Sequence, residues 1–377
     1  MCFEADRHGK AGDLVMRILV DAYWWVDGPY SNRLVLREIV GGWRSAFPDD
    51  ELVLAIPSKW SDSDAELPAG VERISTRMRR HPAINAIELP LYLKSGRDFD
   101  AIFLQNFGAP TSSAAVLVHD VLFQSNPEWF TKIERLYLSA IPILAKRTGL
   151  VMTTTQHEAK RVVAHNSLSS EVAVTGLGLS TTLLTAPARK PRFGLKPHAF
   201  LLTVGRLNVR KNLENTIAAA IESGAISERF PLVVVGQRSG RFSESGVVRS
   251  GVATGAVMFV EFAPDDELRW LYENCALFCF LSLGEGYGLP PVEAAYFGAP
   301  VLASDIPVFR ENLGEAAAYV DPNDVSAISN AITELLAPAR RERGHTTLPG
   351  AEGRITGDWD FTVETIRTAI AELADST

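Results

Sequence analysis

Short, uninterrupted apolar runs alternate with segments of helical character along almost the whole chain. Leu232–Val235 and Leu277–Leu281, for example, contain no polar residue. Continuous hydrophobicity is typical of strands that are covered on both faces, as in parallel sheets. Helices between such strands form βαβ units. The pattern therefore predicts an α/β chain with parallel sheets.

Twelve strands and two long helices follow from this pattern. We expect helices over Asn32–Ala46 and Glu128–Arg147, the second with an apolar stripe of Ile133, Leu136, Ala140, Ile143 and Leu144. The expected strands are Arg17–Asp21, Leu52–Ile56, Ala101–Leu104, Ala115–His119, Gly149–Thr153 and Val172–Thr175, then Phe200–Val204, Leu232–Val235, Val257–Glu261, Leu277–Leu281, Val301–Ala303 and Ala317–Val320.

The length of 377 residues suggests two or three domains. Ser180–His198 contains three prolines and several cations without an apolar period, which indicates a linker. We therefore expect one domain over residues 1–185 and a second over 186–358. Residues 1–15 would be a poorly ordered extension. A last helix within 359–377 would pack back toward the first domain.

Composition excludes several classes of protein. The net charge of −8 argues against non-specific nucleic-acid binding. The three cysteines form no C-x-x-C pair, so neither a zinc site nor a disulfide framework is indicated. No apolar run is long enough to span a bilayer, and the start of the chain lacks a secretory h-region. We expect a cytoplasmic protein.

The segment Gly284–Ala294 carries two carboxylates, Glu285 and Glu293, eight positions apart. Its glycines allow backbone to approach a ligand closely, and Pro290-Pro291 suits a helix start. We expect Glu285 in a loop and Glu293 in the first turn of the following helix. Free N–H groups at a helix start bind anions, and carboxylates accept hydroxyl hydrogen bonds, so a nucleotide sugar fits this layout. The alternative is a surface pair of helix-capping glutamates.

A second cluster, Gly205–Asn212, follows an expected strand. Arg206 and Lys211 flank its loop, and both residue types bind phosphate oxygens. Open parallel sheets bind ligands beyond the carboxyl ends of their strands, where this loop would lie. Together the two cations could neutralise a diphosphate without a metal. The alternative is a solvated basic turn before a helix.

These two segments together resemble the donor-binding signature of the retaining glycosyltransferases of family 4, also described as glycosyl transferases group 1. Glu285 and Glu293 match the E-x7-E pattern of that family, and Gly205, Arg206, Lys211 and Asn212 match its G-R…K-N pattern. The resemblance implies the GT-B fold, two Rossmann-like domains with parallel sheets facing across a cleft. The N-terminal domain would bind the acceptor and the C-terminal domain the nucleotide sugar.

The resemblance also implies residue roles in the second half. Glu285 would bind hydroxyls of the donor sugar near the reacting carbon, and Glu293 the ribose hydroxyls. Arg206 and Lys211 would hold the diphosphate. Backbone groups of Gly205, Gly286, Tyr287, Gly288 and Leu289 would support the sugar and phosphates. Glu261-Phe262 stands where many members have glycine near the base, which leaves the base open.

The first half resembles the family more weakly. The loop with Gly28, Tyr30 and Ser31 stands where the family keeps a glycine-bearing loop across the donor phosphates. Ser31 could instead, or also, cap the helix that follows. His119, in His119-Asp120 at an expected strand end, would face the cleft close to the sugar. The alternative for His119 is a structural histidine.

The implied activity is metal-independent transfer of a hexose from a nucleotide diphosphate sugar to a hydroxyl, with retained configuration and no cofactor. Mannose from GDP-mannose, passed to a glycan or lipid-linked glycan in cell-surface polysaccharide synthesis, is the expected case. The basic run Arg77–His81 should be a solvated face, but peripheral contact with the inner face of the membrane stays open. The alternatives are a nucleotide-sugar epimerase or other GT-B enzyme, and a catalytically silent nucleotide-sugar-binding subunit. No G-x-G-x-x-G follows a strand, so an NAD-dependent dehydrogenase is not expected.

Overall fold

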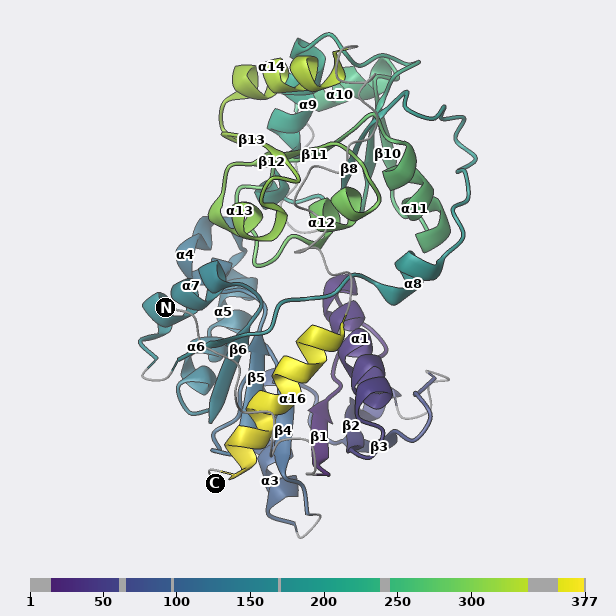
Figure 1. Cartoon of the computed structure of the whole chain (residues 1–377). Coiled ribbons are helices and arrows are strands. Elements are labelled where there is room, and N and C mark those ends of the chain that lie inside the picture. The colour runs from purple at the N-terminus through teal and green to yellow at the C-terminus, as the bar shows by residue number, and fades with distance from the viewer. Residues whose placement is uncertain are drawn as a thin grey trace. The chain divides into compact units, whose positions relative to one another are not determined.

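The structure is a computed structural model that describes residues 15–60, 66–95, 98–168, 171–237, 245–337 and 359–375 (Figure 1). It forms two compact units. The first takes in the described residues of Met1–Val121, Leu136–Gly178 and Asp358–Thr377, and the second those of Leu122–Arg135 and Leu179–Gly357. Each unit contains one parallel sheet with helices packed against it. The extension expected at residues 1–15 lies, apart from Val15, outside the described residues.

The sheet of the first unit has seven strands in the order β3-β2-β1-β4-β5-β6-β7. All of its strand pairs are parallel, with Ile18 opposite Leu52 on one side and Ala101 on the other. The chain direction across the sheet reverses between β1 and β4, which is where ligands of such sheets bind. The strands are β1 Arg17–Asp21, β2 Glu51–Pro57, β3 Glu72–Thr76, β4 Ala101–Gln105, β5 Ala114–Val118, β6 Leu150–Thr153 and β7 Ala173–Val174.

Helices α1 (Tyr30–Ala46) and α16 (Asp360–Asp375) pack together in the first unit. Their buried faces share one core, with Trp43 on α1 and Val363 and Ile366 on α16. Asp50 lies at the edge of this core, where it pairs with Arg367 at 2.7 Å and accepts from the Trp43 indole at 2.8 Å. The last helix therefore packs on the first unit, from which it is separated in sequence by the whole second sheet.

The prediction of one long helix over Glu128–Arg147 is wrong. The segment instead forms a 3-10 turn at Pro127–Trp129, then α5 (Lys132–Leu138) and α6 (Ala140–Ala145). Pro142 has no N–H for the carbonyl of Leu138, so the helix cannot run through regularly at this point. The expected stripe is not a core face, since Ile133 is 81% and Leu136 77% exposed.

The other helices of the first part of the chain are short. Between β3 and β4 a helical stretch runs from α2 (His81–Ala83) through a π-helical turn (Ile84–Glu88) into α3 (Leu89–Leu93). A 3-10 turn (Ser58–Trp60) follows β2, α4 (Leu122–Ser125) follows β5, and α7 (Gln156–Asn166) follows β6.

The sheet of the second unit has six parallel strands in the order β10-β9-β8-β11-β12-β13. The order in which the chain adds strands reverses between β8 and β11, and the carboxyl ends of these two strands carry the two motif loops. The strands are β8 Leu201–Val204, β9 Leu232–Val235, β10 Val257–Val260, β11 Leu277–Phe280, β12 Val301–Ser304 and β13 Ala318–Val320.

Alternate residues of these strands enter two different cores. Leu202, Val233 and Phe278 pack on one face of the sheet, and their neighbours Leu201, Leu232 and Leu277 on the other. The first face is covered by α11 (Asp265–Asn274), α12 (Leu289–Tyr296) and α13 (Pro307–Leu313), with α8 (Thr181–Thr185) beside α11. The second is covered by α9 (Leu213–Glu222), α10 (Gly246–Ala253) and α14 (Val325–Leu336).

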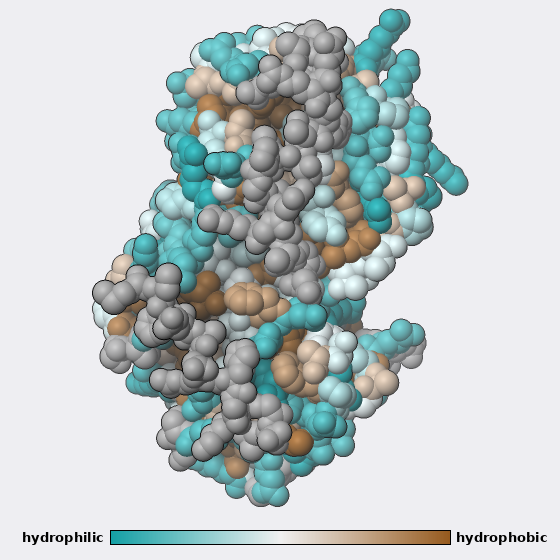
Figure 2. Space-filling model, in the orientation of Figure 1, coloured by the Kyte–Doolittle hydropathy of each residue, from teal (hydrophilic) through white to brown (hydrophobic). Residues whose placement is uncertain are grey.

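With both sheets covered by helices, the face of the molecule in Figure 2 carries mainly hydrophilic residues and residues of intermediate hydropathy, with separate hydrophobic patches. None of the helices in the described ranges has the length and apolar character that crossing a bilayer requires.

Candidate functional site

The two motif loops of the second unit meet at the point where its sheet changes direction. Gly205 follows β8, and Glu285 lies in the loop between β11 and α12. Their strands are direct neighbours, with Leu201 opposite Leu277. The structure brings Lys211 and Glu285 together, with Lys211 Nζ 2.6 Å from Glu285 Oε1.

Glu285 holds two cations in a nearly closed environment. Its side chain is 8% exposed. Arg210 Nη1 donates to Oε2 of Glu285, and Lys211 Nζ donates to Oε1. The same Arg210 nitrogen donates to the carbonyl of Gly284 at 2.9 Å. One carboxylate therefore faces two cations, and the cluster carries excess positive charge.

The pKa values of this cluster follow from that imbalance. Burial alone would raise the pKa of Glu285, but the charges of Arg210 and Lys211 outweigh it and hold the pKa at about 2. Burial lowers the pKa of Lys211 to about 8, although the charge of Glu285 opposes this shift. The positive charges of Arg210 and Arg206 lower it further. A buried cation whose charge is partly unbalanced favours binding of an anion.

Lys211 is held by contacts on several sides. Its ammonium lies 4.5 Å from the centre of the Phe280 ring, and Asn208 Oδ1 accepts its backbone N–H at 3.2 Å. A Cβ on Gly205, whose φ is +148°, would lie 3.2 Å from Lys211 Cε. The stem of Lys211 also lines a small pocket with Thr203, Val204, Leu207, Leu213 and Val234.

The glycine-rich turn before α12 is tightly packed. Gly288 has a φ of +86°, and a Cβ there would lie 2.5 Å from the Phe309 ring. A Cβ on Gly284 would lie 2.9 Å from the Trp129 ring. The Tyr287 carbonyl accepts from Asn312 at 2.7 Å, and Leu289 is the first residue of α12. At Gly284 and Gly288, therefore, the backbone before α12 lies where a side chain would not fit.

Glu293 lies in the second turn of α12, not in the first as expected, because the helix begins only at Leu289. The side chain is buried, and the Tyr272 hydroxyl donates to Oε2 at 2.7 Å. Burial raises the pKa of Glu293 to about 7 despite this hydrogen bond. Because Glu293 is buried and lies beyond the first turn, it is not a surface capping residue.

The remaining cation of the motif, Arg206, is exposed. It lies close enough to Lys211 for its charge to lower the pKa of that lysine. The structure thus brings Gly205, Arg206, Lys211 and Glu285 into one region of the second unit.

His119 follows β5 in the first unit and is partly exposed. Its backbone N–H donates to Asn106 Oδ1 at 3.2 Å, and its Nε2 lies 3.4 Å from Gln105 Oε1. Burial lowers the pKa of His119 to about 4, with the charge of Asp120 opposing the shift. The imidazole is therefore neutral near pH 7.

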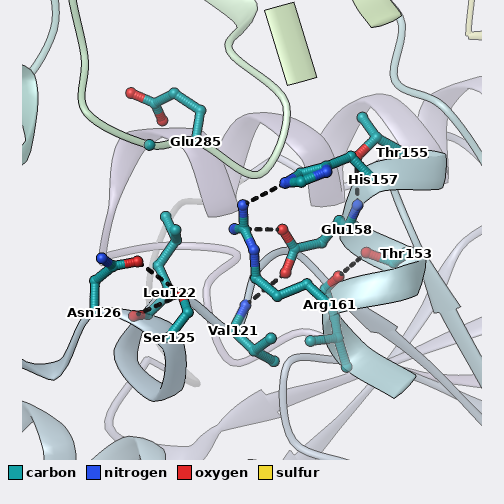
Figure 3. A network of polar contacts seen from close by, with 12 residues as sticks. Val121, Leu122, Ser125, Asn126, Thr153, Thr155, His157, Glu158, Arg161 and Glu285 are labelled. Carbon is teal, nitrogen blue, oxygen red and sulfur yellow. Dashed lines mark hydrogen bonds and ion pairs between the residues drawn. The ribbon is translucent and has the colours of Figure 1, made fainter. Parts of the chain in front are cut away.

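The loop after His119 is held by a buried carboxylate (Figure 3). Glu158 Oε1 accepts the backbone N–H of Val121 at 2.8 Å, and Oε2 pairs with Arg161 at 2.8 Å. Arg161 also contacts His157 Nε2 at 2.8 Å. Thr155 caps α7 by accepting the N–H of Glu158. The Glu158–Arg161 pair thus fixes the position of the chain two residues after His119.

The loop expected to cross the donor phosphates leads from β1 into α1. Gly28 has a φ of +126°, and its backbone lies against the Trp24 ring. Tyr30 is the first helical residue and is 53% exposed. The expected cap at Ser31 is wrong, because Ser31 lies inside the helix and Pro29 occupies the capping position without a side-chain bond.

Two residues that contact the motif glutamates of the second unit were not expected from the sequence. Arg210 binds Glu285 directly, and the only signal for it was its position beside Lys211. Tyr272 binds Glu293 from α11, and nothing in its spacing pointed to that contact.

Comparison with known proteins is consistent with this geometry. Residues 188–344 match the family model described as glycosyl transferases group 1. The chain is 26% identical over 232 residues to O-antigen chain mannosyltransferase B of Escherichia coli, covering 59% of this chain and 61% of the relative. It is 31% identical over 245 residues to the D-inositol 3-phosphate glycosyltransferase of Acidothermus cellulolyticus, covering 59% of this chain and 54% of the relative. The chain thus spans less than two thirds of the length of either relative.

The fold has a solved counterpart. Sucrose-phosphate synthase from Thermosynechococcus elongatus superposes with a TM-score of 0.72 at 16% identity, over 96% of this chain and all of that one. Two parallel sheets in Rossmann-like units, together with this likeness, confirm the expected GT-B fold. Residues 188–344 are thus similar to the glycosyl transferases group 1.

Proposed function

We propose that this protein is a retaining hexosyltransferase that moves mannose from GDP-mannose to a hydroxyl of a glycan or lipid-linked glycan acceptor in surface-polysaccharide synthesis. The observation that carries the proposal is the Glu285 carboxylate, which is held between Arg210 and Lys211 in the loop before α12. Mannose is favoured because a relative at 26% identity is an O-antigen chain mannosyltransferase.

The donor would bind through three groups of contacts. Lys211 and Arg206 supply the positive charge that a diphosphate requires, and the positive end of the α12 dipole adds to it. Glu285 is ionised at neutral pH, so it can accept hydrogen bonds from two sugar hydroxyls. Glu293 would accept the ribose hydroxyls.

Cleavage of the donor would leave negative charge on the departing diphosphate, opposite an oxocarbenium-like sugar. Lys211, Arg206 and the start of α12 would stabilise that charge. In the proposed retaining reaction the acceptor hydroxyl attacks the same face that the diphosphate leaves, and the diphosphate accepts the hydroxyl proton. The chain's own cations would provide the charge that the reaction needs, so the proposal includes neither a metal nor a cofactor. His119 would remain neutral and hydrogen-bond a sugar hydroxyl.

The test is an assay for nucleoside diphosphate release from GDP-mannose and UDP-glucose, with and without a panel of glycan acceptors. We expect acceptor-dependent release that Glu285→Gln and Lys211→Ala each reduce by at least about 100-fold. Glu315→Gln, at an exposed position, is the matched control and should keep full activity. Unchanged turnover in Glu285→Gln or Lys211→Ala contradicts the proposal.

The same assay separates the alternatives. An epimerase would convert the donor without an acceptor and without releasing nucleoside diphosphate. A silent binding subunit would bind the nucleotide sugar in calorimetry and turn over none of the acceptors.

A further inference from the structure

Arg210 joins the two motif loops by three contacts. Its carbonyl accepts the backbone N–H of Leu283 at 2.8 Å. Its Nη1 donates to the carbonyl of Gly284 and to Oε2 of Glu285. The side chain is 20% exposed. Arg210 therefore fixes both the backbone and the carboxylate of the loop that carries Glu285.

Lys211 has two possible partners in the proposed reaction. In this structure it binds Glu285 Oε1 at 2.6 Å, whereas the proposed function requires it on the donor diphosphate. A lysine that turns from one anion to the other leaves Glu285 without one of its cations. Leaving a buried carboxylate without any cationic partner is strongly destabilising. The exchange therefore needs a second cation that stays with Glu285.

We propose that Arg210 is a positioning residue that keeps Glu285 ionised and in place while Lys211 moves from Glu285 to the donor diphosphate. The inference rests on the proposed function and deepens it. Arg210 does not contact the phosphates in this scheme, and it acts only through Glu285. Its contact with the carbonyl of Gly284 keeps it in place whether or not Lys211 is present.

The geometry also explains why arginine suits this position. Its planar guanidinium donates in fixed directions to two acceptors, the carbonyl of Gly284 and the carboxylate of Glu285. Both bonds come from one nitrogen, Nη1, whose two N–H groups have fixed directions in the guanidinium plane. A lysine at position 210 would carry the charge, but its freely rotating ammonium on a flexible stem would not hold the two acceptors in fixed directions. Lys211, which must change partners, is the flexible cation of the pair.

The decisive experiment is a double-mutant cycle read by calorimetric binding of GDP and of UDP. Arg210→Met leaves Lys211 as the sole partner of Glu285, so we expect nucleotide binding about 10- to 100-fold weaker. Glu285→Gln frees Lys211 and should bind at least as tightly as wild type. The double variant Arg210→Met/Glu285→Gln should also bind like wild type, because no carboxylate remains to retain the lysine. If the double variant stays as weak as Arg210→Met, Arg210 contacts the phosphates itself and the inference is wrong.

The pH profile gives a second, independent readout. Loss of Arg210 should raise the pKa of Glu285, so the acid limb of kcat/KM should move to higher pH by about 1–3 units. A purely structural loss would lower activity equally at all pH values. Arg210→Lys, which retains the charge and should fold if Arg210→Met does not, should leave the acid limb in place and lower kcat. An acid limb that shifts as far in Arg210→Lys as in Arg210→Met contradicts the scheme.

Arg310→Met is the matched control, because Arg310 pairs with Asp305 on the surface of the same unit, where both side chains are at least half exposed. It should change neither nucleotide binding nor the pH profile. If wild type binds neither GDP nor UDP, the proposed function fails, and this inference fails with it. If wild type binds and Arg210→Met behaves like Arg310→Met, only the role of Arg210 is wrong.

Discussion

The hydroxyl of Tyr272 donates to Oε2 of Glu293 at 2.7 Å, which gives a buried carboxylate one neutral hydrogen-bond partner. Glu285, in contrast, has two cationic partners. The two glutamates of the E-x7-E motif consequently have pKa values shifted in opposite directions, to about 2 for Glu285 and about 7 for Glu293. Opposite shifts of this kind in one motif point to different roles.

The raised pKa of Glu293 predicts a pH-dependent stability. The folded protein binds this proton up to about pH 7, whereas an unfolded glutamate releases it near its ordinary pKa. Glu293 therefore favours folding at low pH, and its contribution falls as pH rises from about 4.5 to 7. We expect the free energy of unfolding of the wild type to fall by about 2–3 kcal/mol more than that of Glu293→Gln over that range. Urea unfolding of wild type and variant between pH 5 and 8 measures it, and parallel pH curves would contradict the prediction.

Gly288 should not tolerate a side chain. Gly288→Ala would place a Cβ 2.5 Å from the Phe309 ring at a φ of +86°. We expect a loss of about 2–4 kcal/mol in the free energy of unfolding, together with weaker GDP binding. Gly298→Ala is the matched control, because its φ is +79° and no atom lies within 4 Å of its Cβ position. The control should lose only about 1 kcal/mol, and equal losses in both variants would show that the contact with Phe309 does not matter.

The buried pair of Arg367 and Asp50 should dominate the stability of the contact between α1 and α16. Arg367→Met leaves Asp50 buried without its cation, so we expect a loss of about 3–5 kcal/mol. Asp50→Asn in the same background should restore part of that loss. The exposed pair of Arg310 and Asp305 should matter by about 0–1 kcal/mol when Arg310→Met breaks it. Chemical denaturation of the four proteins checks the order.

His119 should stay neutral throughout the physiological range. Its folded pKa of about 4 lies below the ordinary value, so its contribution to stability falls as pH drops from about 6.5 toward 4. NMR titration of the imidazole, assigned by comparison with His119→Gln, should show no protonation above pH 5.5. A midpoint near 6.5 would contradict the lowered pKa of His119.

Much of the fold could be predicted because hydrophobic periodicity reports burial. β1 and β9 occur with the predicted bounds. β1 is a buried strand in the middle of its sheet, and β9 is buried and entirely apolar. β3 was missed because Glu72-Arg73-Ile74-Ser75-Thr76 is polar and mostly exposed at the edge of its sheet. The broken helix around Pro142 was missed because apolar residues at helical spacing do not reveal whether the stripe is covered.

The site could be predicted only to the level of its loops. Parallel topology brings the ends of β8 and β11 together, so the contact between Lys211 and Glu285 could be foreseen. The part played by Arg210 could not, because a 3-10 turn at Val209–Lys211 and the path of the Leu283–Glu285 loop decide which side chains reach the carboxylate. The same holds for Tyr272, which reaches Glu293 only because α11 packs beside α12.

The chain passes from one unit to the other after Val121, Arg135 and Gly178, and again between the described residues Ala337 and Trp359. Neither unit is therefore encoded by a continuous stretch of sequence. A fragment that begins at residue 179 would lack Trp129, whose ring fills the space beside Gly284. A fragment that ends at residue 178 would lack α16 and leave Asp50 without Arg367. Truncation at the apparent linker would therefore damage both halves, and functional dissection of this protein calls for point substitutions in the intact polypeptide.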